Sequence, residues 1–417
     1  MEKSPIKKVL QVHNRYVWSP GGEIAVLEAE AEILRQAGIK VDQYFVDNEK
    51  DVPGVVAKVR LAKNVVWSTE SLHKIRKAIQ KSKPDIVHVH NFFANISPSV
   101  YKACNLENIP VVQTLHNFRL TCAEANLLRD SRTCQDCVGR FPIAAIKNKC
   151  YRGSLAATLP LVAMQQVNRW NGALTKRCDA YIALSDFARE IFIRSGLPAE
   201  KIFVKPHSTV DPGYIETKRK NRIVFLGRFQ PEKGPEVAVN AWANQMPKDW
   251  ELLMVGVGPL EEEIRAIAAS DPTIKFPGWT ESSEIPNLLR TAKYVLNTSH
   301  CYETFGLSVI EAMAVGTLPI VPNHGQMPQI SDAPKIGNAF DPSCEESLRA
   351  LLQSLTKIPE SEWKSKSIDA RSRYQAFYTP QIALKNLLQI YSDVIDRHAK
   401  LAISTNQNGS DRVIKAS

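Results

Sequence analysis

The sequence predicts an α/β fold with two doubly wound parallel sheets, each in its own domain. Strand-like apolar runs alternate with helix-length segments along the chain, which is the pattern of parallel sheets covered by helices. A strand, a glycine-containing loop and a helix follow one another near residues 8–36 and again near residues 222–240. A length of 417 residues also favours two hydrophobic cores over one.

The first domain is expected at residues 1–212. Its first strand, Lys8–His13, is followed by a turn with Gly21 and Gly22 and then by a helix over residues 23–36. Such glycines let a phosphate approach the backbone, and they are also common in these turns for purely structural reasons. Further strands are predicted at residues 40–46, 85–90, 111–116, 179–184 and 202–205. Turn-forming residues at 210–213 mark the expected domain boundary.

Two predicted strands of this domain end in histidine, namely His90 and His116. The carboxyl ends of parallel strands meet at one edge of the sheet, where ligands of this fold bind. His116 is therefore a candidate for contact with substrate. A role limited to hydrogen bonding within the protein is the alternative for both histidines.

An insertion is predicted at residues 122–153, and it contains Cys122, Cys134, Cys137 and Cys150. A Cys-x-x-Cys pair flanked by two single cysteines supplies four thiolates, which is the ligand set of a structural zinc site. The sequence lacks the second Cys-x-x-Cys pair that is typical of such sites, so thiols without metal are the alternative. Disulfides are not expected in a chain without an export signal.

The second domain is expected at residues 213–380, and its first strand leads into a loop with Arg228 and Lys233. An arginine fork and a lysine point charge in a strand-to-helix loop suit a diphosphate. Solvated surface charges are the alternative. The domain is followed by a predicted amphipathic helix, Gln381–Lys400, and by a polar tail at residues 401–417 that is expected to be disordered.

Residues 294–321 predict a strand, a loop, a helix and a second strand. The helix begins near Phe305, Gly306 and Leu307, where free backbone N–H groups favour a phosphate. Glu303 in the loop and Glu311 on the helix place a carboxylate on each side of this anion site. Carboxylates beside an anion require another partner, and the hydroxyl groups of a sugar would provide it.

The charge and hydropathy of the chain limit its location and partners. The excess of basic residues behind the net charge of +10 lies entirely in the first half, which favours an anionic partner such as a phospholipid surface or a phosphate-bearing acceptor. Residues 55–83 are helix-compatible, basic and amphipathic, which fits a membrane surface and equally an ordinary solvated helix pair. Nucleic acid is not expected, because no basic motif is interleaved with aromatic residues. The sequence shows neither a signal peptide nor a membrane span, so a cytoplasmic location is expected.

Several of these motifs together resemble the family 4 retaining glycosyltransferases of GT-B fold. The resemblance rests on Arg228 and Lys233, on Glu303 and Glu311 around Phe305 and Gly306, and on the run that continues to residue 321. The glycine turn, the segment that ends in His116 and residues 184–190 match in the same order, so nearly the whole chain is covered. The insertion is similar to a segment in a subset of these enzymes that builds bacterial surface polysaccharides. The family implies two Rossmann-like domains facing across a cleft, with the helix at 381–400 crossing back to the first domain.

The resemblance also implies roles for the candidate residues. Arg228 and Lys233 would bind the donor diphosphate and stabilise the leaving group, together with the backbone amides of residues 305–307. Glu311 would hold the ribose, Glu303 and His116 would contact the transferred sugar, and the turn of Gly21 and Gly22 would admit the donor phosphates. No metal cofactor is needed for catalysis in such a site. Two departures, Gln326 in a usually glycine-rich loop and Gln329 where glutamate is common, leave the donor sugar open.

The expected function is transfer of a hexosyl-type group from a nucleotide diphosphate sugar to a glycan or lipid-diphosphate-linked acceptor, in lipopolysaccharide or exopolysaccharide biosynthesis. The enzyme would act in the cytoplasm, at the inner face of the plasma membrane. A nucleotide-sugar epimerase of the same architecture is one alternative. A catalytically inert protein that binds a sugar nucleotide is the other.

Overall fold

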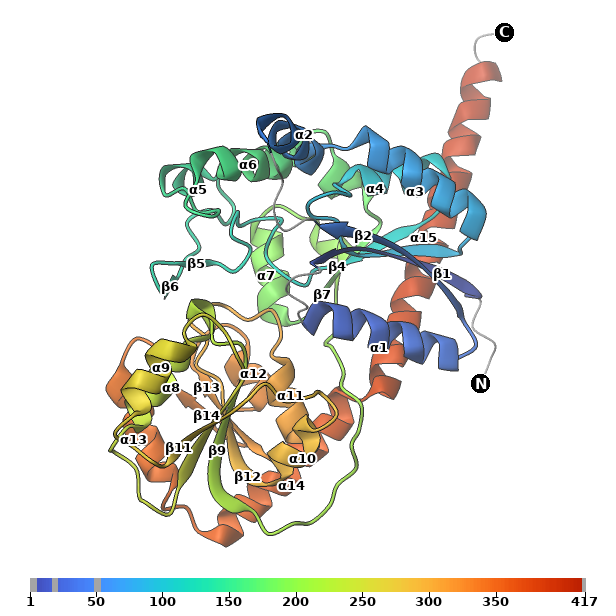
Figure 1. Ribbon diagram of the computed structural model, residues 1–417. Helices are drawn as coiled ribbons and strands as arrows, with labels where there is room; N and C mark the ends of the chain where they lie inside the picture. Colours follow the sequence, from blue (N-terminus) through green and yellow to red (C-terminus); the bar gives the residue numbers. More distant parts are fainter. Residues whose placement is uncertain (1–5, 17–21, 49–53, 415–417) are drawn as a thin grey trace. The chain divides into compact units, whose positions relative to one another are not determined.

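The computed structural model describes residues 6–16, 22–48 and 54–414, with side chains up to residue 401, and it divides into two compact units (Figure 1). Unit 1 comprises Met1–Ala125, Asp136–Lys205 and Leu384–Ser417, and unit 2 comprises Asn126–Gln135 and Pro206–Ala383. Each unit contains a six-stranded parallel sheet. The predicted α/β class with two Rossmann-like sheets is confirmed.

The sheet of unit 1 has the strand order β2-β1-β3-β4-β7-β8. Its strands are β1 (Lys8–Tyr16), β2 (Lys40–Asn48), β3 (Ile86–Asn91), β4 (Val111–Thr114), β7 (Ala180–Ala183) and β8 (Ile202–Val204). The pairing of Val87 with Val111 sets the register of β3 against β4. Because the two strands are parallel and adjacent, their carboxyl ends bring His90 and the residues after Thr114 to the same sheet edge.

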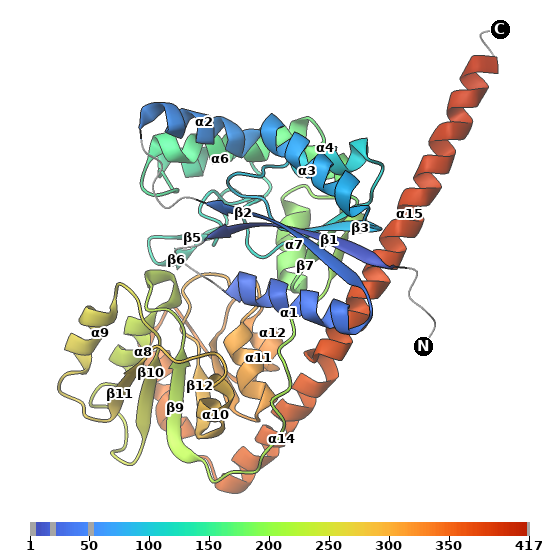
Figure 2. The same ribbon diagram turned by 45° about the vertical axis from the view of Figure 1, so that its right-hand side comes forward.

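Helices cover both faces of this sheet, with α1 on one face and α3 and α4 on the other (Figures 1 and 2). The helices are α1 (Gly22–Gln36), α2 (Val55–Val66), α3 (Thr69–Ser82), α4 (Ser99–Leu106), α5 (Ile143–Lys147), α6 (Leu155–Trp170), α7 (Asp186–Arg194) and the short η1 (Ala173–Arg177) and η2 (Ala199–Lys201). The segment predicted as helical at 55–83 forms two helices. The second starts at Ser68, whose hydroxyl accepts a hydrogen bond from the Ser71 N–H.

The last helix, α15 (Pro380–Ile414), belongs to unit 1 from Leu384 onward. Its buried residues Leu387, Ile390, Tyr391 and Val394 join Leu34 of α1 and apolar residues of the sheet in one core cluster. The helix is longer than predicted, because its backbone continues through residues 401–414, where the sequence suggested a disordered tail. A helix held by packing at one end extends at low cost through polar residues, since each added residue forms one more backbone hydrogen bond.

The sheet of unit 2 has the order β11-β10-β9-β12-β13-β14. Its strands are β9 (Lys220–Leu226), β10 (Glu251–Val255), β11 (Ile274–Gly278), β12 (Ala292–Leu296), β13 (Leu318–Pro322) and β14 (Asn338–Phe340). Its helices are η3 (Pro231–Lys233), α8 (Pro235–Trp242), α9 (Glu261–Ala268), α10 (Ile285–Arg290), α11 (Leu307–Ala314), α12 (Met327–Ser331), α13 (Glu345–Leu355) and α14 (Glu360–Phe377). A two-stranded antiparallel hairpin, β5 (Leu128–Arg129) and β6 (Arg132–Thr133), falls within the part of the insertion assigned to unit 2.

The chain passes from unit 1 to unit 2 between Lys205 and Pro206, a few residues before the predicted boundary at 212. Residues 206–212 belong to unit 2 because α14 holds them. Arg371 donates two hydrogen bonds of 2.7 Å to the carboxylate of Asp211, and the Tyr374 hydroxyl donates to the Thr209 carbonyl at 2.9 Å. Within the described ranges, none of the helices combines the length and the apolar character that crossing a bilayer requires.

Candidate active site

The loop after β9 positions the two basic residues predicted to bind a diphosphate. Arg228 follows directly on the strand and its glycine, and Lys233 ends the single turn of η3. Gly234 then adopts a left-handed conformation with φ +60°, and a Cβ atom there would lie 2.4 Å from the Thr298 carbonyl oxygen. Glycine is therefore required for the loop to approach the segment that follows β12.

That close approach joins the two segments that carry the predicted site. The Thr298 hydroxyl donates to the Gly234 carbonyl at 2.6 Å, and the His300 N–H donates to the Glu232 carbonyl at 3.0 Å. Beside these ties the Lys233 ammonium lies 2.5 Å from Glu303 Oε1, and the Ser299 hydroxyl donates to the same oxygen at 2.6 Å. The structure thus brings together two candidate residues that are seventy positions apart in the chain.

The pair between Lys233 and Glu303 keeps both groups charged. Burial alone would lower the pKa of Lys233, but the attraction and the hydrogen bond of Glu303 raise it above its ordinary value. Burial alone would raise the pKa of Glu303, and the charge of Lys233 together with hydrogen bonds from Lys233 and Ser299 lowers it. The side chains remain 26% and 14% exposed, respectively, so solvent reaches both.

Arg228 lies at the exposed side of this pair. Its guanidinium is 3.6 Å from Glu232, and its side chain is 47% exposed. Its positive charge contributes to lowering the pKa of both Lys233 and Glu303. Two cations, Arg228 and Lys233, therefore share a small volume with two carboxylates, Glu232 and Glu303. The guanidinium and the ammonium are the groups here that an anionic ligand would contact.

The start of α11 is the place where the sequence predicts an anion site. Gly306, with φ +125°, precedes the first helical residue, Leu307. The Gln326 side chain donates to the carbonyl of the buried Phe305 at 2.6 Å, so a residue that departs from the family pattern supports this loop. The Phe305 ring packs against His207 at 5.3 Å between centroids and against Tyr378 at 6.0 Å. The first N–H groups of the helix are thereby held in place.

Glu311 lies one turn into α11 and is half-buried. Burial raises the pKa of its carboxyl to about 7. Among the residues that the structure describes, no side chain or backbone group forms a hydrogen bond or an ion pair with it. A half-buried carboxyl group without a hydrogen-bond partner in the protein is suited to accept hydrogen bonds from the hydroxyl groups of a ligand.

In unit 1, His116 lies just beyond the end of β4, beside His90 at the end of β3. His90 Nδ1 and His116 Nε2 are 3.0 Å apart, and the two rings stack with centroids 5.3 Å apart. Both histidines line a pocket with Asn91, Phe93 and Arg119. The sequence placed both histidines at this sheet edge, and the structure brings them into direct contact.

The sequence analysis missed Arg119, whose guanidinium lies 4.6 Å from the centroid of the Phe93 ring. It also missed Glu23 at the start of α1, which lies 3.7 Å from His13. Burial raises the pKa of Glu23 to about 8 and lowers that of His13 to about 3, so both groups are neutral near pH 7. Gly22 begins α1 and is exposed, whereas Gly21 lies outside the described residues.

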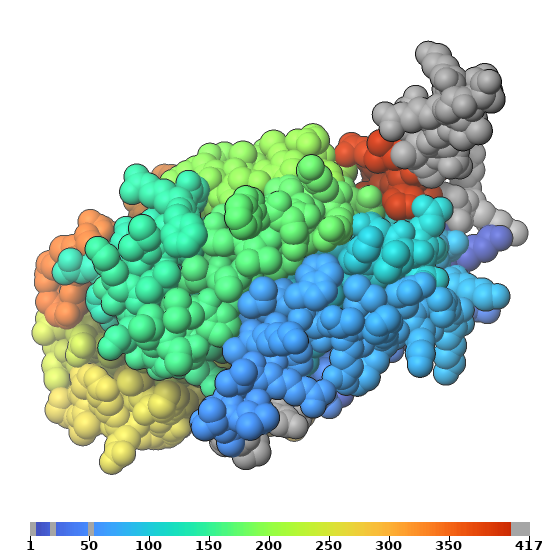
Figure 3. Space-filling model, turned by 90° about the horizontal axis from the view of Figure 1, so that it is seen from above, coloured from blue at the N-terminus to red at the C-terminus, as the bar shows by residue number. Residues whose placement is uncertain are grey.

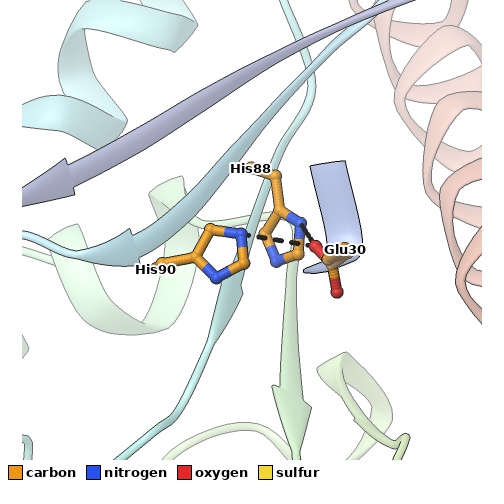
Figure 4. A group of neighbouring side chains, drawn as sticks. All are labelled: Glu30, His88 and His90. Atoms are coloured by element: carbon orange, nitrogen blue, oxygen red, sulfur yellow. Dashed lines mark ion pairs between the residues drawn. The ribbon is translucent and has the colours of Figure 1, made fainter. Parts of the chain in front are cut away.

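A buried polar cluster lies behind His90 and was also missed. Glu30 Oε1 lies 3.0 Å from His88 Nδ1 and 3.3 Å from His90 Nε2 (Figure 4). Glu30 Oε2 lies 3.3 Å from the Lys205 ammonium. The available signal was the position of Glu30 in α1, on the same face as Leu27, Ala31 and Leu34, which are all buried. A carboxylate on the apolar face of a helix requires a buried partner.

The zinc site at Cys122, Cys134, Cys137 and Cys150 stays a prediction. Within the described part of the chain, one group of at least three potential metal ligands has all its ligand atoms within 4.8 Å of one another. That group is Glu30, His88 and His90. Metal analysis of the purified protein tests the cysteine site, and less than about a tenth of an equivalent of zinc would contradict it.

Comparison with known proteins agrees with this arrangement of loops and sheets. The family model described as "Glycosyl transferases group 1" matches residues 211–370, and the model "Glycosyltransferase Family 4" matches residues 20–208. A phosphatidyl-myo-inositol mannosyltransferase of Mycobacterium tuberculosis is 21% identical over 416 residues, covering 93% of this chain and 97% of its own.

Two further proteins show the same likeness. A putative colanic acid biosynthesis glycosyltransferase of Salmonella typhimurium, WcaL, is 23% identical over 237 residues, covering 53% of this chain and 58% of its own. The crystal structure of Anabaena HepE with UDP and glucose superposes with a TM-score of 0.64 at 14% identity, covering 93% of this chain and all of that one. With both halves of the chain matched by models of one family and with its two-sheet fold, the protein belongs to the glycosyltransferases of family 4.

Proposed function

We propose that the protein is a retaining glycosyltransferase that transfers a hexosyl group from a nucleotide diphosphate sugar to a glycan or lipid-diphosphate-linked acceptor. The observation that carries the proposal is the Lys233–Glu303 pair beside Arg228 in unit 2. It sets cations for a diphosphate next to a carboxylate for sugar hydroxyl groups. The UDP and glucose bound by HepE support a donor of this class.

The donor would occupy unit 2 with its diphosphate on Arg228, Lys233 and the first N–H groups of α11. Glu311 would accept hydrogen bonds from the ribose. Only one oxygen of Glu303 is occupied by Lys233 and Ser299, and among the described residues the other oxygen has no hydrogen-bond donor. That second oxygen is the one proposed to accept hydrogen bonds from the transferred sugar.

In the proposed reaction, the bond from the anomeric carbon to the donor phosphate breaks, and a bond from that carbon to the acceptor oxygen forms on the same face. The departing phosphate oxygen takes the proton of the acceptor hydroxyl, so atoms and charge balance without a protein base. Two positive side chains near the leaving diphosphate would stabilise the negative charge that develops on it. No metal ion is required in this scheme, because Arg228 and Lys233 supply the compensating charge.

The acceptor is proposed to belong to the biosynthesis of lipopolysaccharide or exopolysaccharide. The relative WcaL, which is named for colanic acid biosynthesis, supports this class of acceptor. Supporting an acceptor at a membrane, the M. tuberculosis relative is named for a phosphatidyl-inositol substrate.

Unit 1 has a surface suited to the cytoplasmic face of the membrane. Helices α2, α5 and α6 pack side by side, as seen in the space-filling view (Figure 3). Large apolar side chains are exposed on these helices and at Phe141, just before α5. They are Val55, Val56, Val59, Phe141, Ile143, Leu155, Leu159, Val167 and Trp170. On α6 these residues recur every three, four or eight positions and form one stripe, and Trp170 is 94% exposed. We call these nine side chains the apolar face.

The basic residues of α2 and α3 contribute less charge than the sequence suggested. Arg60 and Lys74 both pair with Glu70 at 2.8 Å, and Arg76 pairs with Glu107 at 2.7 Å. Lys58 and Lys77 are exposed and form no ion pair with another described residue. The apolar face is therefore proposed to contribute more to membrane binding than the lysines and arginines do.

Transfer is tested by first screening nucleotide sugars for a rise in melting temperature, since a ligand of the folded state alone stabilises it. The stabilising donor is then incubated with polyprenyl-diphosphate-linked sugars, and the anomeric configuration of the product is read by NMR. A new α- or β-linkage that matches the donor supports the proposal. An inverted linkage, or absence of transfer with every stabilised donor, contradicts it.

The epimerase alternative is separated by the same protein without acceptor. Formation of a new nucleotide sugar from the donor alone would overturn the proposal. An inert binding protein would show the melting shift and no turnover.

Membrane binding is tested by sedimentation with vesicles of phosphatidylglycerol and phosphatidylethanolamine. The double variant Val56→Ser, Trp170→Ser is expected to lose about tenfold or more in partitioning, because burial of each apolar side chain contributes about 1–3 kcal/mol. Phe377→Ser, which removes a 53% exposed aromatic from unit 2, serves as the control and should bind normally. Equal binding of all three proteins would contradict a role for the apolar face.

A further inference from the structure

Unit 1 contains a line of three titratable side chains that runs from its core to the pocket. It begins at Glu30 on α1, continues through His90 on β3 and ends at His116 after β4; we call these three residues the histidine chain. Glu30 is 5% exposed and His90 is 2% exposed. His116 is the member to which the resemblance to family 4 glycosyltransferases gives contact with the transferred sugar.

The contacts along the histidine chain indicate which ring nitrogen of each histidine carries the proton, and we call this order of donors and acceptors the direction of the chain. His90 Nδ1 lies 3.0 Å from His116 Nε2. The buried His90 Nε2 forms no hydrogen bond with a described residue, and the carboxylate oxygen Glu30 Oε1 lies 3.3 Å from it. If His90 carried its proton on Nδ1, the unprotonated Nε2 would lie 3.3 Å from a buried carboxylate oxygen. The carboxylate therefore favours the proton of His90 on Nε2.

The tautomer of His116 follows from that of His90. With its proton on Nε2, His90 presents a lone pair at Nδ1, and this atom can only accept a hydrogen bond. His116 must then donate from Nε2, which leaves its Nδ1 as an acceptor. Stacking of the two rings, with an angle of 24° between their planes, holds the orientation of His116.

Glu30 is held in its charged form by its surroundings. Burial would raise the pKa of its carboxyl, but the neighbouring His88, Lys205 and His90 lower it well below its ordinary value. Lys205 is 4% exposed in its side chain and lies 3.3 Å from Glu30 Oε2. The charge that fixes the direction of the histidine chain is thus compensated within unit 1.

The same side chains offer ligand atoms for a metal ion, but their other contacts favour hydrogen bonding. The ammonium of Lys205 faces the second carboxylate oxygen. His88 Nδ1 contacts the Tyr391 hydroxyl at 2.7 Å, and His88 Nε2 contacts the Thr114 hydroxyl at 2.8 Å. A divalent cation would have to compete with Lys205 for the same carboxylate.

We propose that Glu30 and His90 are positioning residues that fix His116 as the tautomer with its proton on Nε2, so that Nδ1 accepts a hydrogen bond from a hydroxyl of the bound sugar. The assignment of the sugar to His116 rests on the proposed function. The direction of the histidine chain rests on the geometry of unit 1 alone, so the two parts can fail separately.

The tautomers are measured by two-bond proton–nitrogen correlation NMR on protein labelled with ¹⁵N-histidine. The nine histidines give a limited set of signals, and the variants His116→Asn and His90→Gln assign the two of interest. Protons on Nε2 in both His90 and His116 are expected near neutral pH. A proton on Nδ1 of His116, or an equal mixture of its tautomers, would overturn the proposal even in a fully active enzyme.

Kinetics test the consequence for transfer. His90→Phe keeps an aromatic ring but removes both nitrogens, and it is expected to lower kcat/KM by about tenfold or more. His90→Gln, which keeps a donor and an acceptor, should restore most of that loss and the tautomer of His116. If His90→Gln and His90→Phe are equally impaired while their melting temperatures match, the positioning role is refuted.

The matched control is His88→Gln, because His88 contacts the same carboxylate but does not lie between Glu30 and His116. This variant should leave the His116 tautomer unchanged, whatever its effect on stability. If His88→Gln changed the NMR signals of His116 as much as Glu30→Gln does, the order Glu30, His90, His116 would be contradicted. Added zinc that shifts the signals of His88 and His90 at equimolar concentration and raises the melting temperature would replace the proposal with a metal site.

Discussion

Two of the carboxylate–lysine pairs among the described residues, one in each unit, involve the candidate site or the cluster behind it, and they differ in burial. Glu303 and Lys233 in unit 2 are 14% and 26% exposed, with 2.5 Å between their charged atoms. Glu30 and Lys205 in unit 1 are 5% and 4% exposed and 3.3 Å apart. The same two functional groups therefore meet in a solvent-accessible loop and in a protein core.

This difference separates what the two pairs can do. Charged groups that keep contact with water can exchange partners when a ligand enters, since the cost of separating them is low. Charges in a core depend on each other, because an isolated buried charge is strongly unfavourable. We therefore expect changes in the exposed pair to affect mainly turnover, and changes in the buried pair to affect mainly stability.

The largest effect is expected from Lys233→Ala. Loss of the charge proposed to face the leaving diphosphate should lower kcat by about 10³-fold, which corresponds to about 4 kcal/mol in the activation barrier. The free energy of unfolding, measured in urea, should fall by no more than about 1 kcal/mol. Arg265→Ala, which breaks an exposed ion pair with Glu261 in the same unit, should change neither quantity appreciably. Turnover within threefold of wild type would show that the exposed pair is not part of the site.

Lys205→Met is expected to lower stability strongly, whereas Lys233→Ala is expected to lower turnover. Removing the ammonium leaves Glu30 charged in the core, and we expect a loss of about 3–5 kcal/mol in the free energy of unfolding. The double variant Lys205→Met, Glu30→Gln removes both charges and should regain part of that loss. If the single variant were as stable as wild type, the buried pair would not behave as two interdependent charges.

Gly306→Ala tests the backbone that positions the exposed pair's loop. Its φ of +125° is unfavourable for any residue with a side chain, and a Cβ atom would lie 2.7 Å from Met327 Cε. We expect a loss of about 1–3 kcal/mol in the free energy of unfolding, together with weaker donor binding. Gly278→Ala is the matched control, because Gly278 has φ +84° with open space around its Cβ position. Its loss should be smaller, and equal losses would mean that the Met327 contact is unimportant.

Glu311 is a third carboxylate that can be compared with Glu303 and Glu30. It is partly buried, and it forms no ion pair with a described lysine. Its pKa of about 7 lies above the ordinary value, so between these pH values the folded state holds a proton that the unfolded state has lost. Its contribution to stability is accordingly present at low pH and is lost as pH rises through 7. If Glu311 accepts hydrogen bonds from the ribose as proposed, binding of UDP-glucose should strengthen by about threefold to tenfold between pH 6 and 8.

Calorimetric titration at several pH values measures this effect. Glu311→Gln, which cannot ionise, should bind with an affinity independent of pH over the same range. Burial lowers the pKa of His324 below its ordinary value, and the Glu311→Gln variant separates the titration of Glu311 from that of this side chain. A variant with the same pH dependence as wild type would assign the titration to another group.

The fold class, and the residues that lie at the carboxyl ends of the strands, could be predicted from the sequence, because strand ends and glycine turns are local signals. His90, His116, Arg228, Lys233 and Glu303 were all identified from their positions after strands. Their contacts were not, since the 2.5 Å approach of Lys233 to Glu303 depends on two loops that are distant in the chain. Glu30 was missed although its place on the apolar face of α1 was visible, because a single sequence does not show which partners compensate a buried charge.

Helix α15 has a consequence for the order in which the protein acquires its structure. The core of unit 1 includes Leu387, Ile390, Tyr391 and Val394, which the ribosome delivers only after all of unit 2. At a synthesis rate of about 5–20 residues per second, unit 1 would wait about 10–40 s after Lys205 for these side chains. Unit 2 needs nothing from the C-terminal helix beyond Ala383, so during translation it is the unit able to fold first, although the chain begins with the other.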